Sequence, residues 1–131
     1  MSMFHYYNFP HCEAFIFDEF LVTQIREGVT IRPEHNQDLR DIIDLHFSNK
    51  NVVYISNRYF SYGVDPLTYL GTSKIHNLLA IVIVAHDDIK KSNAELESIF
   101  YKKEFAIFPT LSEAMGWAHK VIQNDKKNTS I

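Results

Sequence analysis

The sequence predicts an α/β fold in which helices cover the faces of a mixed β-sheet. Strand and helix patterns alternate in the last third of the chain, and residues 80–85 form an unbroken run of small and β-branched side chains. Such a run is typical of a strand covered on both faces, because a half-solvated strand alternates apolar with polar residues. The length of 131 residues suits a single core. We therefore expect one domain over residues 13–123, an N-terminal arm over 1–12 and a polar C-terminal tail over 124–131.

The domain is expected to start with a β-hairpin. Residues 14–17 and 20–25 are rich in aromatic and β-branched side chains, and Asp18 and Glu19 separate them, which favours antiparallel pairing. After Gly28 and the apolar residues 29–31, Pro33 is followed by an acidic residue, as is typical of a helix start.

The first helix is expected to cover one side of the sheet and to lead into a strand at residues 52–55. Asp65 and Pro66 then predict a second helix, with an N-cap followed by proline at the first helical position. The apolar residues at helical spacing in the first helix are Leu39, Ile42, Ile43 and Phe47. Those in the second helix are Leu67, Leu70, Ile75, Leu78 and Leu79.

Two capping-box spacings mark the last two helices. Ser92 and Glu95 precede a short third helix, while Thr110 and Glu113 precede the fourth, after a strand at 105–108. The apolar residues of the third helix are Leu96, Ile99 and Phe100. The buried stripe of the last helix is expected to consist of Leu111, Ala114, Ala118, Val121 and Ile122. The predicted order is therefore ββαβαβαβα, with right-handed crossovers.

This order resembles the SpoIIAA-like fold of the STAS domains, the family of anti-sigma-factor antagonists and sulfate-transporter tails, and is most similar to small bacterial STAS-like proteins. The resemblance rests on the strand 52–55, the loop into Asp65 and Pro66, the strand 80–85, and the ending 108–118 with its Trp117. It spans about residues 13–122. The fold implied is an α/β sandwich with an N-terminal hairpin and about four helices, and the function implied is a non-enzymatic interaction module in signalling regulation.

In phosphorylatable STAS antagonists, a partner kinase phosphorylates a serine of an Asp-Ser-Ser-Gly-like motif at the start of a helix. The corresponding stretch here is Phe60-Ser61-Tyr62-Gly63, so the resemblance implies Ser61 as the phosphoacceptor. Ser61 lacks the preceding Asp and the small neighbours of that motif. The alternative is that Ser61 is a polar turn residue.

The loop around Ser61 is also the main candidate for a contact surface. Tyr and Arg combine large contact area with hydrogen bonding, and both are enriched at the centres of protein interfaces. The alternative is local packing under the edge of the sheet. A second aromatic group in the arm, at residues 4–9, raises the hypothesis of a homodimer. The residues predicted to bind a protein partner are Arg58, Tyr59, Phe60, Ser61, Tyr62 and Asp65.

Composition excludes several classes of protein. The net charge is −3 without a long basic run, which argues against nucleic-acid binding. The single Cys12 cannot form an internal disulfide and is interpreted as a small structural residue, and the first residues lack the pattern of a signal peptide. The apolar run 78–85 is far below the roughly 20 residues that cross a bilayer. We expect a cytoplasmic protein without a membrane span.

No sequence motif indicates catalysis. The four glycines are isolated from one another, and no His-x-x-x-His pair is present, so phosphate loops and helical metal sites are not expected. His86, Asp87 and Asp88 carry atoms that could hold a cation or act as acid and base, but a solvated turn before a helix is the preferred interpretation. We predict no enzyme, no cofactor and no metal. The alternative function is a small-molecule- or lipid-binding domain related to the Sec14 type.

Overall fold

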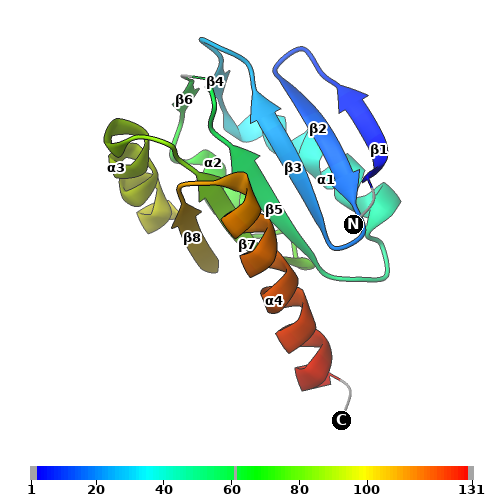
Figure 1. Ribbon diagram of the computed structural model, residues 1–131. Helices are drawn as coiled ribbons and strands as arrows, with labels where there is room; N and C mark the ends of the chain where they lie inside the picture. Colours follow the sequence, from blue (N-terminus) through cyan, green and yellow to red (C-terminus); the bar gives the residue numbers. More distant parts are fainter. Residues whose placement is uncertain (1–2, 61, 130–131) are drawn as a thin grey trace.

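The computed structural model describes residues 3–60 and 62–129 and has a six-stranded mixed sheet at its centre (Figure 1). The strand order is β1-β2-β3-β5-β7-β8. The bounds are β1 Met3–Asn8, β2 Cys12–Phe17, β3 Phe20–Ile25, β5 Val52–Asn57, β7 Leu78–Val84 and β8 Glu104–Phe108. Two short strands, β4 Thr30–Ile31 and β6 Gly63–Val64, pair in parallel beside this sheet.

The first half of the sheet is antiparallel and the second half is parallel. In the β2–β3 hairpin Ala14 pairs with Thr23 and Ile16 with Leu21, as predicted from the two aromatic and β-branched segments. From β3 onward each strand pairs in parallel with the next one in the sheet. Parallel neighbours need a crossover, and the helices supply it.

Helices cover both faces of the sheet, but unequally. The helices are α1 Asn36–His46, α2 Thr68–Thr72, α3 Asp88–Glu97 and α4 Leu111–Thr129, with 3₁₀ turns η1 Pro33–His35 before α1 and η2 Ser98–Phe100 after α3. Buried side chains of α1, α2 and α3 share one core cluster, whereas those of α4 belong to a second cluster on the other face. Figure 1 shows α4 lying in front of the sheet and α1 and α2 behind it.

Strand β7 confirms the prediction made from its unbroken apolar run. Ala80, Val82 and Val84 belong to the cluster under α4, whereas Ile81 and Ile83 belong to the cluster under α1 and α2. Both faces of the strand are therefore shielded from water, so its apolar residues do not alternate with polar ones. The buried stripe of α4 is confirmed as well, with Ala114, Ala118 and Ile122 buried and Leu111 and Val121 packed against them.

The terminal segments differ from the predicted division. Residues 3–8 of the expected arm form the edge strand β1, antiparallel to β2, so the sheet has one more strand at its start than the order ββαβαβαβα. At the other end α4 continues to Thr129 through most of the expected tail. Strand β1 forms because β2 provides a pairing partner, which the sequence of residues 3–8 does not reveal by itself. Helix α4 extends through the polar residues after 123 because it continues a helix that has already started at Leu111.

Helix α2 is shorter than predicted and ends at Thr72, so Ile75 and Leu78 of its predicted apolar stripe are buried outside the helix. Leu67 and Leu70 are exposed, while Thr68 and Thr72 are buried. The inward face is polar because α2 packs on buried Asn36, whose Nδ2 donates to the Thr68 carbonyl at 2.9 Å and whose Oδ1 accepts from the Thr72 hydroxyl at 2.7 Å. A Cβ on Gly71 would lie 2.9 Å from Asn36 Nδ2, so this close approach requires glycine.

Helix α3 begins earlier than its predicted capping box. Asp87 is the N-cap and accepts a hydrogen bond from the backbone N–H of Lys90 at 2.8 Å, which places Ser92 inside the helix. Ala94 is the buried residue, while Leu96 and Ile99 are 65% and 69% exposed. At Thr110 and Glu113 one of the two expected capping-box bonds is present, because the backbone N–H of Glu113 donates to Thr110 Oγ1 at 3.2 Å. The Glu113 carboxylate accepts from the Thr110 hydroxyl at 3.0 Å and not from its backbone N–H.

Candidate functional site

A buried ion pair organises the region where β5 ends. The guanidinium of Arg58 donates from Nη1 and Nη2 to Glu97 Oε2 and Oε1 at 3.0 and 2.6 Å. The two side chains are only 4% and 12% exposed. The hydroxyl of Tyr69 donates to Glu97 Oε1 at 2.7 Å, and Arg58 Nε donates to the Tyr62 hydroxyl at 2.9 Å. These bonds tie the β5 end to α2 and α3.

The electrostatics of this network favour the charged pair. Burial alone would lower the pKa of Arg58, but the contacts with Tyr62 and Glu97 raise that pKa above its ordinary value. Burial, followed by the Glu97 carboxylate, holds the pKa of Tyr69 well above its ordinary value. Tyr69 therefore stays protonated and serves Glu97 as a hydrogen-bond donor.

The predicted partner-binding residues are divided between the interior and the surface. Arg58 and Tyr62 belong to the internal network, and the carboxylate of Asp65 accepts from the backbone N–H of Leu67 at the entry to α2, at 3.0 Å. Tyr59 and Phe60 are exposed and contact each other edge-to-face, with ring centroids 5.1 Å apart. Ser61 lies outside the described residues. The surface part of this prediction is therefore the pair Tyr59 and Phe60.

In the turn formed by His86, Asp87 and Asp88, the central residue Asp87 has a structural role. Asp87 caps α3 and forms a 3.3 Å ion pair with Lys90. The backbone hydrogen bond from Lys90 is the first cause that lowers the pKa of Asp87. In the ranges 3–60 and 62–129, the structure brings together no group of three His, Cys, Asp or Glu side chains suited to a metal ion.

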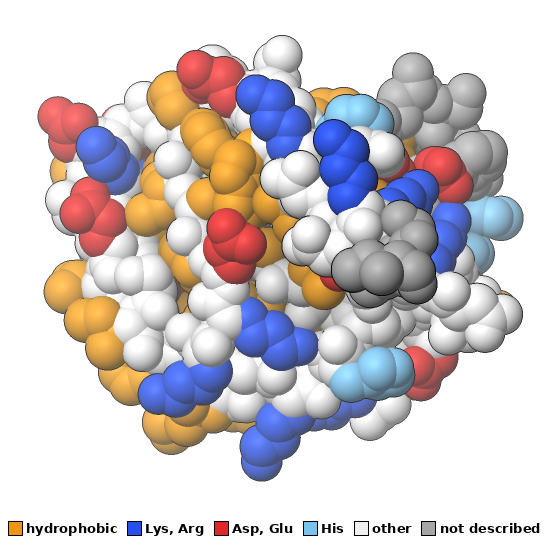
Figure 2. All heavy atoms as spheres, turned by 90° about the horizontal axis from the view of Figure 1, so that it is seen from below, with side chains coloured by type: hydrophobic (Ala, Val, Ile, Leu, Met, Phe, Trp, Pro, Cys, Tyr) orange, Lys and Arg blue, Asp and Glu red, His pale blue; other side chains and the backbone are white. Residues whose placement is uncertain are grey.

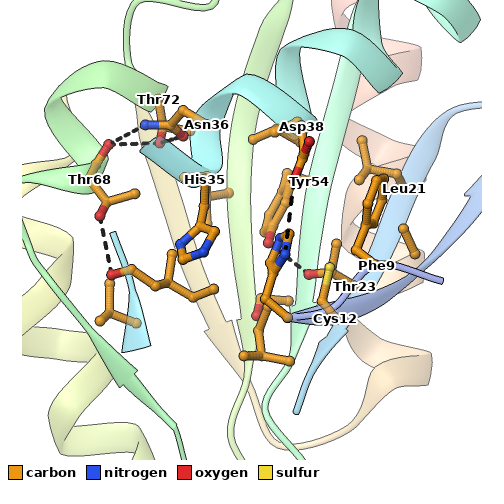
Figure 3. Close-up of a pocket in the computed structure, with 18 of the residues that line it drawn as sticks. Phe9, Cys12, Leu21, Thr23, His35, Asn36, Asp38, Tyr54, Thr68 and Thr72 are labelled. Atoms are coloured by element: carbon orange, nitrogen blue, oxygen red, sulfur yellow. Dashed lines mark hydrogen bonds and ion pairs between the residues drawn. The ribbon is translucent and has the colours of Figure 1, made fainter. Parts of the chain in front are cut away.

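A cavity of about 70 Å3 lies between the sheet and the segment from β4 to α2 (Figure 3). Its floor comes from β2, β3, β5 and β7 near the ends of the parallel strands, which is a common place for ligands in α/β proteins. In Figure 3, His35, Asp38, Thr23, Tyr54 and Cys12 surround the opening between the helix and the strands. The sequence offered no signal for this cavity, because its walls come from strands, loops and helices that are distant from one another along the chain.

Two hydroxyl pairs form the polar part of the cavity wall. Thr23 Oγ1 lies 2.7 Å from the Tyr54 hydroxyl, and Ser56 Oγ lies 2.8 Å from the Tyr62 hydroxyl. Thr23 and Ser56 face each other across the β3–β5 pairing, so the two pairs are neighbours. Burial raises the pKa of Tyr54 and of Tyr62, which keeps both phenols protonated.

The rim of the cavity carries stacked imidazole rings. The centroids of His11 and His35 are 4.4 Å apart, and Phe9 stacks on the other side of His11 at 5.6 Å. Burial first, and then the charge of His35, lowers the pKa of His11, although Asp38 at 4.0 Å acts in the opposite direction. Burial also raises the pKa of the nearby Cys12 thiol to about 12, as expected of a structural rather than a nucleophilic cysteine.

A second polar cluster joins the β2–β3 turn to α4. The carboxylate of buried Glu19 lies 2.5 Å from His119 Nδ1 and accepts from Gln123 Nε2 at 2.7 Å. An open polar groove of about 340 Å3 lies beside it, where Asn51 donates to Asp125 at 2.7 Å. These contacts are internal pairs that hold the C-terminal helix on the sheet.

Comparison of the chain with protein-family models, with curated proteins and with solved structures finds no match in any of the three. Within the described residues no helix is long and apolar enough to cross a membrane. The fold is thus an α/β fold with a mixed sheet, and what this protein binds has to be argued from its own surface and cavity.

Proposed function

We propose that this chain is a non-enzymatic, STAS-like interaction module that binds a protein partner. Of the nine large hydrophobic side chains that are exposed in the described part of the chain, seven lie between residues 59 and 99. This concentration in one stretch of the chain, whose segments are joined by hydrogen bonds, is the observation that carries the proposal. Single exposed apolar side chains are ordinary, whereas apolar side chains on adjoining segments indicate a contact site. We name these seven the apolar surface: Tyr59, Phe60, Leu67, Leu70, Ile89, Leu96 and Ile99.

The elements that carry the apolar surface contact one another. The backbone carbonyl of Tyr59 accepts from Lys90 Nζ at 3.2 Å, so the loop after β5 touches the first turn of α3. At its other end, α3 reaches α2 through the bond from Tyr69 to Glu97. Figure 2 views the molecule from below, from the end away from the loop after β5, and shows hydrophobic side chains together on its left half.

The buried ion pair gives this surface a rigid base. Arg58 precedes Tyr59 directly, and Glu97 lies between Leu96 and Ile99, so the bidentate bond joins the two segments that carry exposed side chains. A preorganised surface loses less conformational entropy on association. The charges around it are mixed, with two acidic residues at 87–88 beside two lysines at 90–91, so the partner suited to it is an apolar protein segment rather than a strongly charged one.

Regulation of this contact is the part of the proposal that rests on the resemblance alone. Ser61 follows Phe60 in the chain, and a phosphate there would add a charge of about −2 next to an apolar contact. Phosphorylation would therefore weaken partner binding. Mass spectrometry of the protein from its natural source, together with binding by Ser61→Ala and Ser61→Asp variants, tests this step.

The lipid-carrier alternative receives no support from the cavity. Sites for drug-sized ligands occupy roughly 300–1,000 Å3, whereas this cavity has about 70 Å3. An acyl chain does not fit in that space, so only a much smaller group can enter.

The test is a comparison of partner capture by three proteins: wild type, Leu96→Glu/Ile99→Glu, and Leu45→Glu. Leu45 is the matched control, because it is 70% exposed on α1 and lies outside the apolar surface. We expect a partner from the source organism's lysate that binds wild type and the Leu45 variant and loses at least tenfold in affinity for the double variant. Equal binding by all three proteins, or no specific partner, would contradict the proposal.

A further inference from the structure

The cavity wall contains more hydrogen-bond donors than acceptors. The Thr23–Tyr54 pair has two hydroxyl protons, and the bond between the two oxygens uses one of them, whichever atom donates. The Ser56–Tyr62 pair likewise has two protons and one mutual bond, and the Tyr62 oxygen also accepts from Arg58. One hydroxyl proton in each pair is therefore left without an acceptor among the described residues.

The two spare donors belong to neighbouring residues that line one cavity. Thr23 and Ser56 are register partners on adjacent strands, and such strands lie about 4.8 Å apart. All four hydroxyl residues line the same cavity. A single oxygen atom has two lone pairs, so an oxygen within hydrogen-bond distance of both hydroxyl pairs would accept from both spare donors.

The remaining walls define the rest of the ligand. The cavity is otherwise mainly apolar, with Leu21, Ile81 and Ile83 in its floor. Its rim includes the rings of Phe9 and His11, whose faces stack on each other and on Tyr7 and His35, so a group at the rim contacts the edges of these rings. The Asp38 carboxylate lies at the rim, and the described residues that line the cavity include no Lys or Arg, so the lining favours a neutral ligand over an anion.

Size limits what can enter. A cavity of about 150 Å3 is known to take benzene, and this one has about half that volume, about 70 Å3. It accommodates a head group of about three or four non-hydrogen atoms, while any ring has to remain at the rim.

We propose that the cavity is a binding site for a small neutral molecule with a carbonyl oxygen, of the carboxamide or ketone class. The oxygen accepts from the spare hydroxyls of the Thr23–Tyr54 and Ser56–Tyr62 pairs. The remainder of the ligand lies at the rim, beside the ring edges of Phe9 and His11. This site is separate from the apolar surface, and neither proposal depends on the other.

The test uses three probes of the same shape: benzamide, benzoate and toluene. They differ in whether the substituent on the ring is a neutral acceptor, an anion or a methyl group. Binding is followed by titration of backbone amide chemical shifts in the 15N-labelled protein. We expect saturable shifts at Thr23 and Ser56 with benzamide, and at least tenfold weaker binding of benzoate and toluene.

Two variants check that the hydroxyls recognise the oxygen. Thr23→Val/Tyr54→Phe keeps the shape of both side chains and removes both hydroxyls of one pair, because either hydroxyl left alone would still have a proton to donate. Ser56→Ala/Tyr62→Phe does the same at the neighbouring pair if the first variant folds poorly. Each should weaken benzamide about tenfold, the loss expected for about 1.4 kcal/mol, and leave toluene unchanged. Absence of saturable shifts at these residues, which is the result for a cavity that holds only water, would overturn the proposal. So would equal affinity for benzamide and toluene, or unchanged benzamide affinity in the variants.

Discussion

His5 on the edge strand and His46 at the end of α1 bring their imidazole rings to a centroid distance of 4.3 Å. His46 Nε2 also lies 2.5 Å from the hydroxyl of Tyr7. Strand β1 is thus tied to α1 by contacts of a neutral imidazole. His11 and His35 form a similar pair farther along the same side of the fold, at 4.4 Å. Four of the seven histidines therefore join the N-terminal strands to the first helical segment.

These pairs make the fold sensitive to acid. Burial, and then the charge of His5, lowers the pKa of His46, and burial, followed by the charge of His35, lowers that of His11. The facing charged groups at His11 are Asp38, which raises the pKa, and Arg26, which lowers it. With a folded-state pKa below the unfolded value, the unfolded chain binds more protons, so the free energy of unfolding falls as the pH drops through about 6.5.

Urea unfolding between pH 8 and pH 5 measures this dependence. We expect the midpoint concentration to decrease toward pH 5 in the wild type and to decrease less in His46→Gln. The exposed His76 supplies the control, since His76→Gln should keep the wild-type dependence. A His46→Gln profile parallel to the wild type would show that the pair does not contribute.

Breaking the buried ion pair should be strongly destabilising. Arg58→Met leaves the Glu97 carboxylate buried beside Tyr69 without its cation, and the expected loss is about 3–5 kcal/mol of unfolding free energy. Replacing both partners, as in Arg58→Met/Glu97→Leu, should cost less than the sum of the two single changes. Additive losses in chemical denaturation would mean that the two side chains are energetically independent.

Two glycines should respond in opposite directions to alanine. At Gly71 a Cβ meets Asn36 Nδ2 at 2.9 Å, whereas at Gly116 in α4 it meets nothing within 4 Å. We expect Gly71→Ala to lower the unfolding free energy by about 1–3 kcal/mol. Gly116→Ala should raise it by about 0.5–1 kcal/mol, because alanine is the better helix former. Thermal and urea unfolding of both variants check the contrast, and equal effects would refute the close approach of α2 to Asn36.

Adjacent acidic residues in the β2–β3 turn should differ in importance. Glu19 is buried and bonded to His119 and Gln123 of α4, so Glu19→Ala should cost about 1–3 kcal/mol. Asp18 forms a 2.9 Å pair with Lys50 at the exposed surface, so Asp18→Ala should cost less than about 1 kcal/mol. Hydrogen exchange along α4 provides a second measurement, since only the Glu19 change should accelerate exchange there. Similar costs for both changes would argue against this anchoring role.

Elements with a strong local pattern could be predicted from the sequence. The hairpin at β2 and β3, strand β7 and the capped helix α4 agree with expectation because the determining residues lie within a few positions of one another. The edge strand β1 could not be predicted, because it forms by pairing with β2 and its own residues carry no clear strand pattern. The candidate site was predicted only in part: the loop after β5 was identified, but the internal role of Arg58 depends on Glu97, 39 positions away.

The sequence by itself determined an α/β fold, because the spacing of apolar residues indicates which face of each strand or helix has to be buried. The tertiary structure decided which of those faces remain exposed to solvent. Leu96 and Ile99 stand at positions that a helical stripe would bury, yet α3 packs through Ala94 and Glu97 and leaves both exposed. The same holds for the cavity, whose hydroxyl pairs join Thr23 to Tyr54 across 31 positions. Local pattern specifies how much apolar surface an element has, whereas only the packing of distant segments specifies what covers it.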